Sequence, residues 1–137
     1  MLLALPLLFL GLLYYTAIVF TVGAPFLDKT FFTINMMSGD IWVLTHGHVF
    51  IMVSLGLLFV ELIRSTKTGA GSIINHARSM GVFVIGLLLF VMVKGFGNSI
   101  FFIFLLMTLL DVMAGFIVTI VTARRDFSVA EGALGAR

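Results

Sequence analysis

Four long apolar segments constrain the fold of this chain more than any other feature. A transmembrane helix needs about 20 consecutive, mostly apolar residues. Hydrophobic residues make up 61% of the chain and charged residues only 10%, against about 25% charged in ordinary soluble domains. The sequence therefore predicts an all-α integral membrane protein with four transmembrane helices in an antiparallel bundle. The predicted spans are approximately Leu2–Val22, Ile41–Ile63, His76–Phe96 and Ser99–Ala123.

These segments leave no room for a soluble domain. We expect residues 1–125 to form one transmembrane domain and residues 126–137 to form a flexible cytoplasmic tail. Because basic residues prefer the cytoplasmic side, both termini are predicted to face the cytoplasm. We expect Leu2–Val22 to be retained, since it is longer than a signal-peptide core of about 7–15 residues and no basic residue precedes it. The basic residues that set this orientation are Arg64, Lys67, Arg78, Arg124 and Arg125.

Several function classes are excluded or disfavoured by composition. The chain has no cysteine, which excludes disulfides, thiolate metal sites and a cysteine nucleophile. Its net charge is only +2, and its basic residues lie in short connections, so we predict no nucleic-acid partner. The sequence contains no glycine-rich phosphate loop, nucleophile elbow or catalytic carboxylate pair. We therefore predict neither enzymatic activity nor a cofactor.

Histidine spacing also argues against a metal site. His46 and His48 are two residues apart, which corresponds to a turn of about 200° on a helix. Their imidazoles would point away from each other, and His76 is predicted at the opposite membrane face. A haem with two histidine ligands would need a second histidine at the same depth, which only a symmetric dimer could supply. The prediction is therefore no metal.

Asp111 is the only charged residue in the last predicted span. A carboxylate at the centre of a bilayer costs roughly 2.5–3.5 kcal/mol, so it should face the bundle interior. Small and hydroxyl side chains recur on the same helix face at steps of three and four residues. Such residues let helices approach and bond across the contact. The predicted packing face comprises Thr108, Asp111, Gly115, Thr119 and Thr122.

His48 is the partner that we expect for Asp111, in direct or water-mediated contact. At 1.5 Å per residue, His48 lies about 6 Å outside the middle of its predicted span, and Thr108 about 4.5 Å outside Asp111. The three could therefore form one intramembrane network. Lys94 lies about 12 Å outward, and its long stem should reach the outer surface instead.

We predict structural roles for several residues outside this network. Ala77 and Gly81 form a small-xxx-small pair expected to pack against another helix. Glu61 and Arg64 are three residues apart and are expected to form an interfacial ion pair. Trp42 is expected to be an interfacial anchor, just after Asp40, a predicted helix N-cap.

The longest connection, Gly23–Asp40, is itself apolar. We expect it to be a loop that lies among the lipid headgroups or caps the bundle. A partner-binding surface is the alternative, because exposed apolar patches often mark interaction sites.

Three functional hypotheses remain. The first is a small non-enzymatic accessory subunit of a larger membrane assembly, in contact with lipid and with other membrane proteins or a second copy. The second is an oligomeric ion channel or proton-coupled carrier centred on Asp111, since ionisable residues within membranes often mark ion pathways. The third is a quinone- or haem-associated anchor. The expected location is multi-pass in a bacterial inner membrane.

Overall fold

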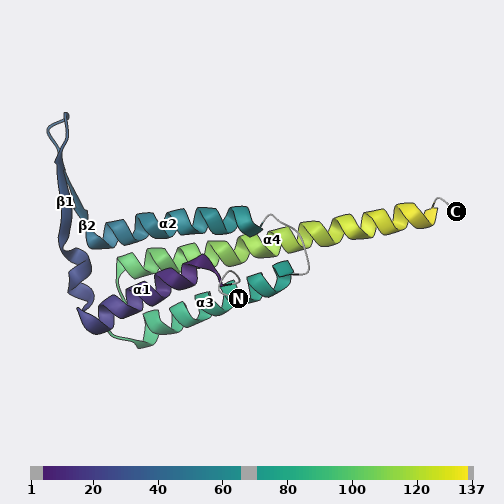
Figure 1. Cartoon of the computed structure of the whole chain (residues 1–137), viewed down its shortest axis with the longest axis horizontal. Helices are drawn as coiled ribbons and strands as arrows, with labels where there is room; N and C mark the ends of the chain where they lie inside the picture. The colour runs from purple at the N-terminus through teal and green to yellow at the C-terminus, as the bar shows by residue number, and fades with distance from the viewer. Residues whose placement is uncertain (1–4, 66–70, 136–137) are drawn as a thin grey trace.

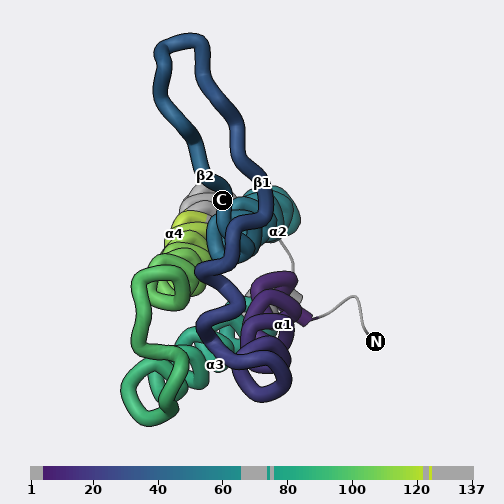
Figure 2. The backbone as a smooth tube through the Cα atoms, turned by 90° about the vertical axis from the view of Figure 1, so that its left-hand side faces the viewer, coloured from purple at the N-terminus to yellow at the C-terminus, as the bar shows by residue number. Residues whose placement is uncertain are grey.

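The computed structural model describes residues 5–65 and 71–135. This part of the chain is mostly helical, and the helices alternate in direction along the bundle (Figure 1). A 3-10 helix and an antiparallel hairpin follow the first helix, and the hairpin projects sideways from the helices (Figure 2). The elements are α1 (Leu7–Thr21), η2 (Ala24–Asp28), β1 (Thr30–Asn35), β2 (Ile41–Thr45), α2 (His46–Ser65), α3 (Gly71–Met92) and α4 (Ser99–Gly135). Helix α4 packs against α2 and α3, and α1 also packs against α2 and α3.

Two helical segments are long and apolar enough to cross a membrane. They are α2 and the Ser99–Val121 part of α4. Helix α1 is also apolar but shorter, as is the His76–Met92 part of α3. At 1.5 Å per residue the 15 residues of α1 span about 22 Å, less than the roughly 30 Å of a hydrocarbon core. The predicted helical architecture is therefore confirmed with two candidate spans.

A cluster of aromatic rings forms the core near the hairpin end of the bundle. Tyr15 of α1 is fully buried, and its ring centroid lies 5.4 Å from Phe50 and 4.6 Å from Phe101. The Asn98 side-chain amide donates to the Tyr15 hydroxyl at 2.6 Å, while its carbonyl accepts the Phe101 amide at 3.0 Å. Asn98 thus caps α4 and ties it to α1.

The predicted start of the second span is wrong. Ile41–Thr45 is strand β2, paired with β1 in the register Ile34↔Trp42 and Phe32↔Leu44. β-Branched and aromatic residues favour strands, and Gly39 supplies a positive φ of 92° in the connecting turn. Asp40 lies in this turn and therefore cannot cap α2.

The predicted tail also differs. Helix α4 continues to Gly135 instead of ending near Ala123, and it extends well beyond the other helices (Figure 1). The sequence has no proline after Pro25, so no residue forces the helix to end. The predicted flexible tail is therefore helical as far as Gly135. The predicted cytoplasmic connection, with Lys67, lies outside the described residues, as do the first residues of the first predicted span.

Candidate functional site

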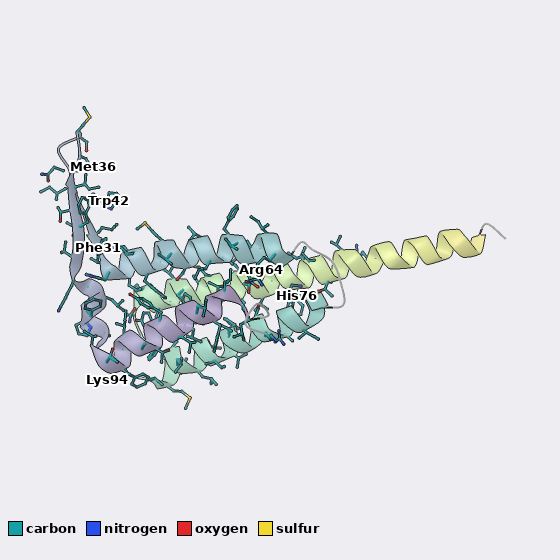
Figure 3. All side chains as sticks on the ribbon, viewed as in Figure 1. Phe31, Met36, Trp42, Arg64, His76 and Lys94 are labelled. Atoms are coloured by element: carbon teal, nitrogen blue, oxygen red, sulfur yellow. The ribbon has the colours of Figure 1, made fainter. Side chains whose placement is uncertain are left out.

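Four buried polar side chains gather from three helices, and we call them the polar cluster: Glu61, His76, Ser79 and Asp111. Glu61 is 1% exposed and Asp111 is 4% exposed. The Ser79 side chain hydrogen-bonds Asp111, and both Glu61 and His76 lie within electrostatic reach of this carboxylate. Figure 3 shows His76 and Arg64 far from the hairpin along the bundle. The cluster therefore lies away from the hairpin.

Glu61 connects α2 to the beginning of α1. Its Oε2 atom accepts the backbone N–H of Leu7 at 3.0 Å and lies 3.6 Å from Arg64 Nη1. Pro6 precedes α1 and provides no side-chain cap, so Glu61 satisfies a free amide at this helix end. A carboxylate is also favoured there by the helix dipole. The predicted ion pair between Glu61 and Arg64 forms, and Glu61 is buried where it meets the start of α1.

His76 on α3 packs directly against Gly115 on α4, at the polar cluster. A Cβ atom built on Gly115 would overlap the His76 ring. Gly115 is buried, and its missing side chain is the space that the imidazole fills. The small residue therefore has a specific steric role, as expected where helices pack closely.

The two predicted threonines bond to their own helix. Thr108 is buried, and its hydroxyl donates to the Leu105 carbonyl at 2.7 Å. The half-buried Thr119 donates to the Gly115 carbonyl at 3.0 Å. Thr108 therefore does not supply the predicted link to Asp111. The side chain of Thr122 lies outside the described set.

The predicted contact between His48 and Asp111 is wrong. His48 is exposed and occupies the first turn of α2, where its backbone N–H donates to Thr45 Oγ1 at 3.3 Å. In return His48 Nδ1 accepts the Thr45 N–H at 3.2 Å, so the two residues cap the helix reciprocally. Glu61, which lies near Asp111, is about 20 Å farther along α2 at 1.5 Å per residue. The prediction failed because α2 begins at His46 and not at Ile41.

The predicted packing pair on α3 is also wrong. Ala77 is exposed, and a Cβ atom on Gly81 would meet nothing within 4 Å. The buried face of α3 instead carries His76, Ser79 and Val82. These positions recur every three residues, so Ala77 and Gly81 lie on other faces of the helix.

Trp42 and Lys94 are both exposed near the hairpin end. Trp42 is 46% exposed on β2, and Lys94 lies in the turn between α3 and α4 (Figure 3). Lys94 therefore lies in the same connection as Asn98, away from the polar cluster.

The hairpin presents one wholly apolar face. Because side chains alternate along a strand, the paired residues Phe32↔Leu44 and Ile34↔Trp42 lie on the same side. Phe32, Ile34 and Trp42 are 39–56% exposed. We call these four residues the apolar hairpin face. The opposite face is mixed, with the pairs Thr33↔Val43 and Asn35↔Ile41.

Sequence reasoning missed the roles of His76 and Ser79. Their three-residue spacing is visible in the sequence, but the predicted span begins at His76, which places this residue at the headgroups. Helix α3 begins five residues earlier, at Gly71, so His76 lies inside the helix and not at its first residue. Its ring packs against Gly115. Among the side chains that the structure describes, no three from His, Asp or Glu are arranged to hold a metal ion.

Comparison with known proteins gives no relative: no family model, curated protein or solved structure matches this chain.

Proposed function

We propose that this protein is a non-enzymatic accessory subunit of a larger membrane assembly and that it docks through its hairpin. The apolar hairpin face is the observation that carries the proposal. A two-stranded hairpin alone is marginally stable in water, and contiguous exposed apolar surface is typical of interaction sites. A partner that covers Phe32, Ile34 and Trp42 would stabilise the hairpin and would also remove this apolar surface from water.

A membrane location supports this proposal. The outward side chains of the helices are large and apolar, including Val53, Phe59, Val91 and Phe116. Soluble monomers rarely expose such continuous apolar surface, whereas lipid accommodates it. With the four helices across the bilayer, the hairpin would lie along the outer membrane surface, because it runs crosswise to the helices (Figure 1).

The expected occupant of the apolar hairpin face is a protein rather than lipid. Elements that bind a bilayer surface are usually rich in lysine and arginine. The hairpin from Thr30 to Thr45 has no basic residue and carries Asp40 in its turn, which anionic headgroups would repel. Met36 and Met37 are exposed beside this turn, and methionine adapts well to protein surfaces. The partner should thus offer an apolar surface at the membrane boundary.

The test is co-purification from the native membrane in mild detergent. Ile34→Lys with Trp42→Lys places two charges on the apolar hairpin face. The matched control, Thr33→Lys with Asn35→Lys, places the same charges on the opposite face of the same hairpin. We expect a stoichiometric larger partner with the native chain and the control, and its loss with the first variant. Retention of the partner by the first variant, or a homo-oligomer with nothing attached, would refute the proposal.

A proton-coupled carrier or channel is the second candidate. It is favoured by the buried carboxylate of Asp111, which lies near a second buried carboxylate, Glu61, and near His76. It ranks second because the aromatic core around Tyr15 and Phe101 fills the bundle toward the hairpin. Ion flux in proteoliposomes that Asp111→Asn abolishes would establish it, and the absence of flux under imposed gradients would remove it.

A further inference from the structure

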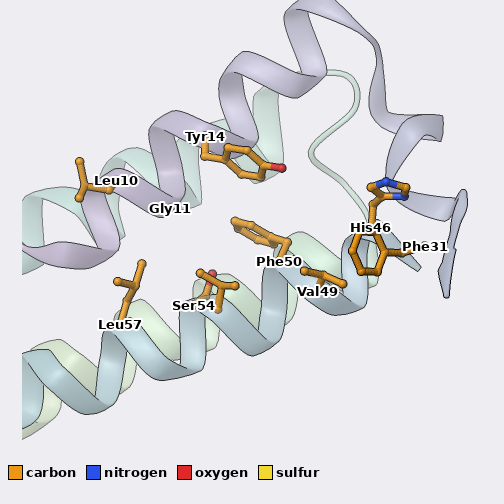
Figure 4. A pocket seen from close by; sticks show the side chains of 10 residues that line it. Leu10, Gly11, Tyr14, Phe31, His46, Val49, Phe50, Ser54 and Leu57 are labelled. Atoms are coloured by element: carbon orange, nitrogen blue, oxygen red, sulfur yellow. The ribbon is translucent and has the colours of Figure 1, made fainter. Parts of the chain in front are cut away.

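A groove of about 330 Å³ lies between α1 and α2. Figure 4 shows Leu10, Gly11 and Tyr14 on the α1 side and Phe50, Ser54 and Leu57 on the α2 side. Almost all of these side chains are apolar, as in most small-molecule sites. Leu10 and Tyr14 are about half exposed, so the groove opens toward the surroundings of the bundle and not into its core.

Three residues in the wall of this groove carry polar side-chain atoms, Tyr14, His46 and Ser54, and Ser54 is the buried one. It is 1% exposed, and its hydroxyl is the one buried side-chain polar atom without a hydrogen-bond partner among the side chains that the structure describes. Other helical hydroxyls here bond to a carbonyl of their own helix. Examples are Thr16, Thr21, Ser65, Thr108 and Thr119, at 2.6–3.0 Å. A buried hydroxyl without a partner costs about 1–3 kcal/mol, so Ser54 needs an acceptor.

Gly11, the α1 residue opposite Ser54, has no side chain. Ser54 points toward α1 at Gly11 (Figure 4), where a Cβ atom would lie 3.6 Å from the Ser54 hydroxyl oxygen. Next to it, the rings of Tyr14 and Phe50 are nearly parallel, with centroids 6.1 Å apart and planes 18° apart. The groove therefore combines a buried hydroxyl that has no hydrogen-bond partner with flat aromatic walls.

The depth of Ser54 restricts what could satisfy it. It lies eight residues into the 20-residue helix α2, which is about 12 Å from the start of the helix. If α2 crosses the bilayer, the hydroxyl lies in the hydrocarbon region, below the ester carbonyls of phospholipids. The acceptor must then belong to a molecule that dissolves fully in the bilayer.

We propose that this groove binds an apolar, bilayer-soluble carbonyl compound of the long-chain quinone class, with one carbonyl oxygen accepting a hydrogen bond from Ser54. The planar ring matches the aromatic wall formed by Tyr14 and Phe50, and the chain follows Leu10 and Leu57. This site is separate from the apolar hairpin face and does not depend on docking.

The test uses the full chain in lipid nanodiscs with a decyl-substituted benzoquinone as the probe. Binding is measured by native mass spectrometry, and the carbonyl stretch of an isotope-labelled probe by difference infrared spectroscopy. Three variants are compared: Ser54→Ala removes the donor, Val53→Trp fills the groove, and Ser65→Ala is the matched control. Ser65 is a serine on the same helix whose hydroxyl already bonds to Leu62. A decanoyl methyl ester serves as the probe for acyl lipids.

We expect saturable binding and a carbonyl band shifted to lower frequency in the native chain and in Ser65→Ala. Ser54→Ala should lose the shift and bind about three- to tenfold more weakly, the range of one hydrogen bond. Val53→Trp should bind no probe while keeping its helical content. The proposal fails if the native chain does not bind the quinone, if Ser54→Ala behaves as native, or if only the ester binds.

Discussion

Glu61 Oε2 on α2 lies 3.0 Å from the backbone nitrogen of Leu7, the first residue of α1. The same oxygen lies 3.6 Å from Arg64 Nη1. This carboxylate thus satisfies one helix end and one cation at the same time. The hydrogen bond between Ser79 and Asp111 and the packing of His76 against Gly115 connect α3 to α4. With the contacts of Glu61, these interactions join all four helices at the polar cluster. In our account, the polar cluster is a structural tether for the bundle that presents the hairpin.

Removal of the Glu61 carboxylate should destabilise the bundle. Glu61→Ala leaves the Leu7 amide without its acceptor, and hydrogen bonds to charged groups contribute about 1.5–3 kcal/mol. Glu61→Gln keeps an acceptor and should lose less. Unfolding in mixed detergent, followed by circular dichroism, measures both variants. Equal stability of Glu61→Ala and the native chain would contradict the tether.

Asp111 should tolerate asparagine better than leucine. Asn can still accept a hydrogen bond from Ser79, whereas Asp111→Leu leaves this buried hydroxyl without a partner, at a cost of about 1–3 kcal/mol. The same unfolding assay, with co-purification of the partner, compares the variants. Lower stability or weaker assembly with Asp111→Asn than with Asp111→Leu would contradict this structural role of Asp111.

Gly115→Ala should destabilise the contact between α3 and α4. The added methyl group overlaps the His76 ring, and overpacking of this kind costs about 1–3 kcal/mol. Gly81→Ala is the matched control, because it meets nothing within 4 Å and should gain up to about 1 kcal/mol in helix propensity. Adding His76→Ala should relieve the clash, so the double-mutant cycle should show strong coupling. Additive effects would exclude the steric contact.

His48 and Asp111 should be energetically independent. Thr45→Ala removes the reciprocal cap of α2 and should cost about 1 kcal/mol, and His48→Ala should have a similar effect. Since His48 lies far from the polar cluster, a double-mutant cycle of His48→Ala and Asp111→Asn should give additive changes within about 0.5 kcal/mol. Coupling well above this value would instead support the direct contact between His48 and Asp111 that the sequence predicted.

How much the sequence could predict depends on the type of signal. Length and hydropathy predicted a mainly helical chain, and the small, polar stripe on α4 pointed to the face on which Thr108, Asp111 and Gly115 are buried. The partner of Asp111 could not be derived, because depth along a helix was measured from a predicted boundary. The five residues of β2 moved that boundary for α2.

Strand β2 shows why this boundary was missed. The residues Ile41–Thr45 are apolar enough to continue a hydrophobic span, and only pairing with Thr30–Asn35 makes them a strand. That pairing depends on the tertiary context of the hairpin. The unpartnered Ser54 hydroxyl is likewise visible only in three dimensions, since a helical serine normally bonds to its own backbone.

Photo-crosslinking from the hairpin in native membranes can show whether a partner protein covers the apolar hairpin face. Benzoylphenylalanine replaces Trp42 on the apolar hairpin face in one variant and Thr33 on the opposite face in the other. We expect one discrete protein adduct, heavier than a dimer of this chain, from position 42 and little or none from position 33. Adducts only with lipid, only with a second copy, or equally from both positions would contradict docking through the hairpin.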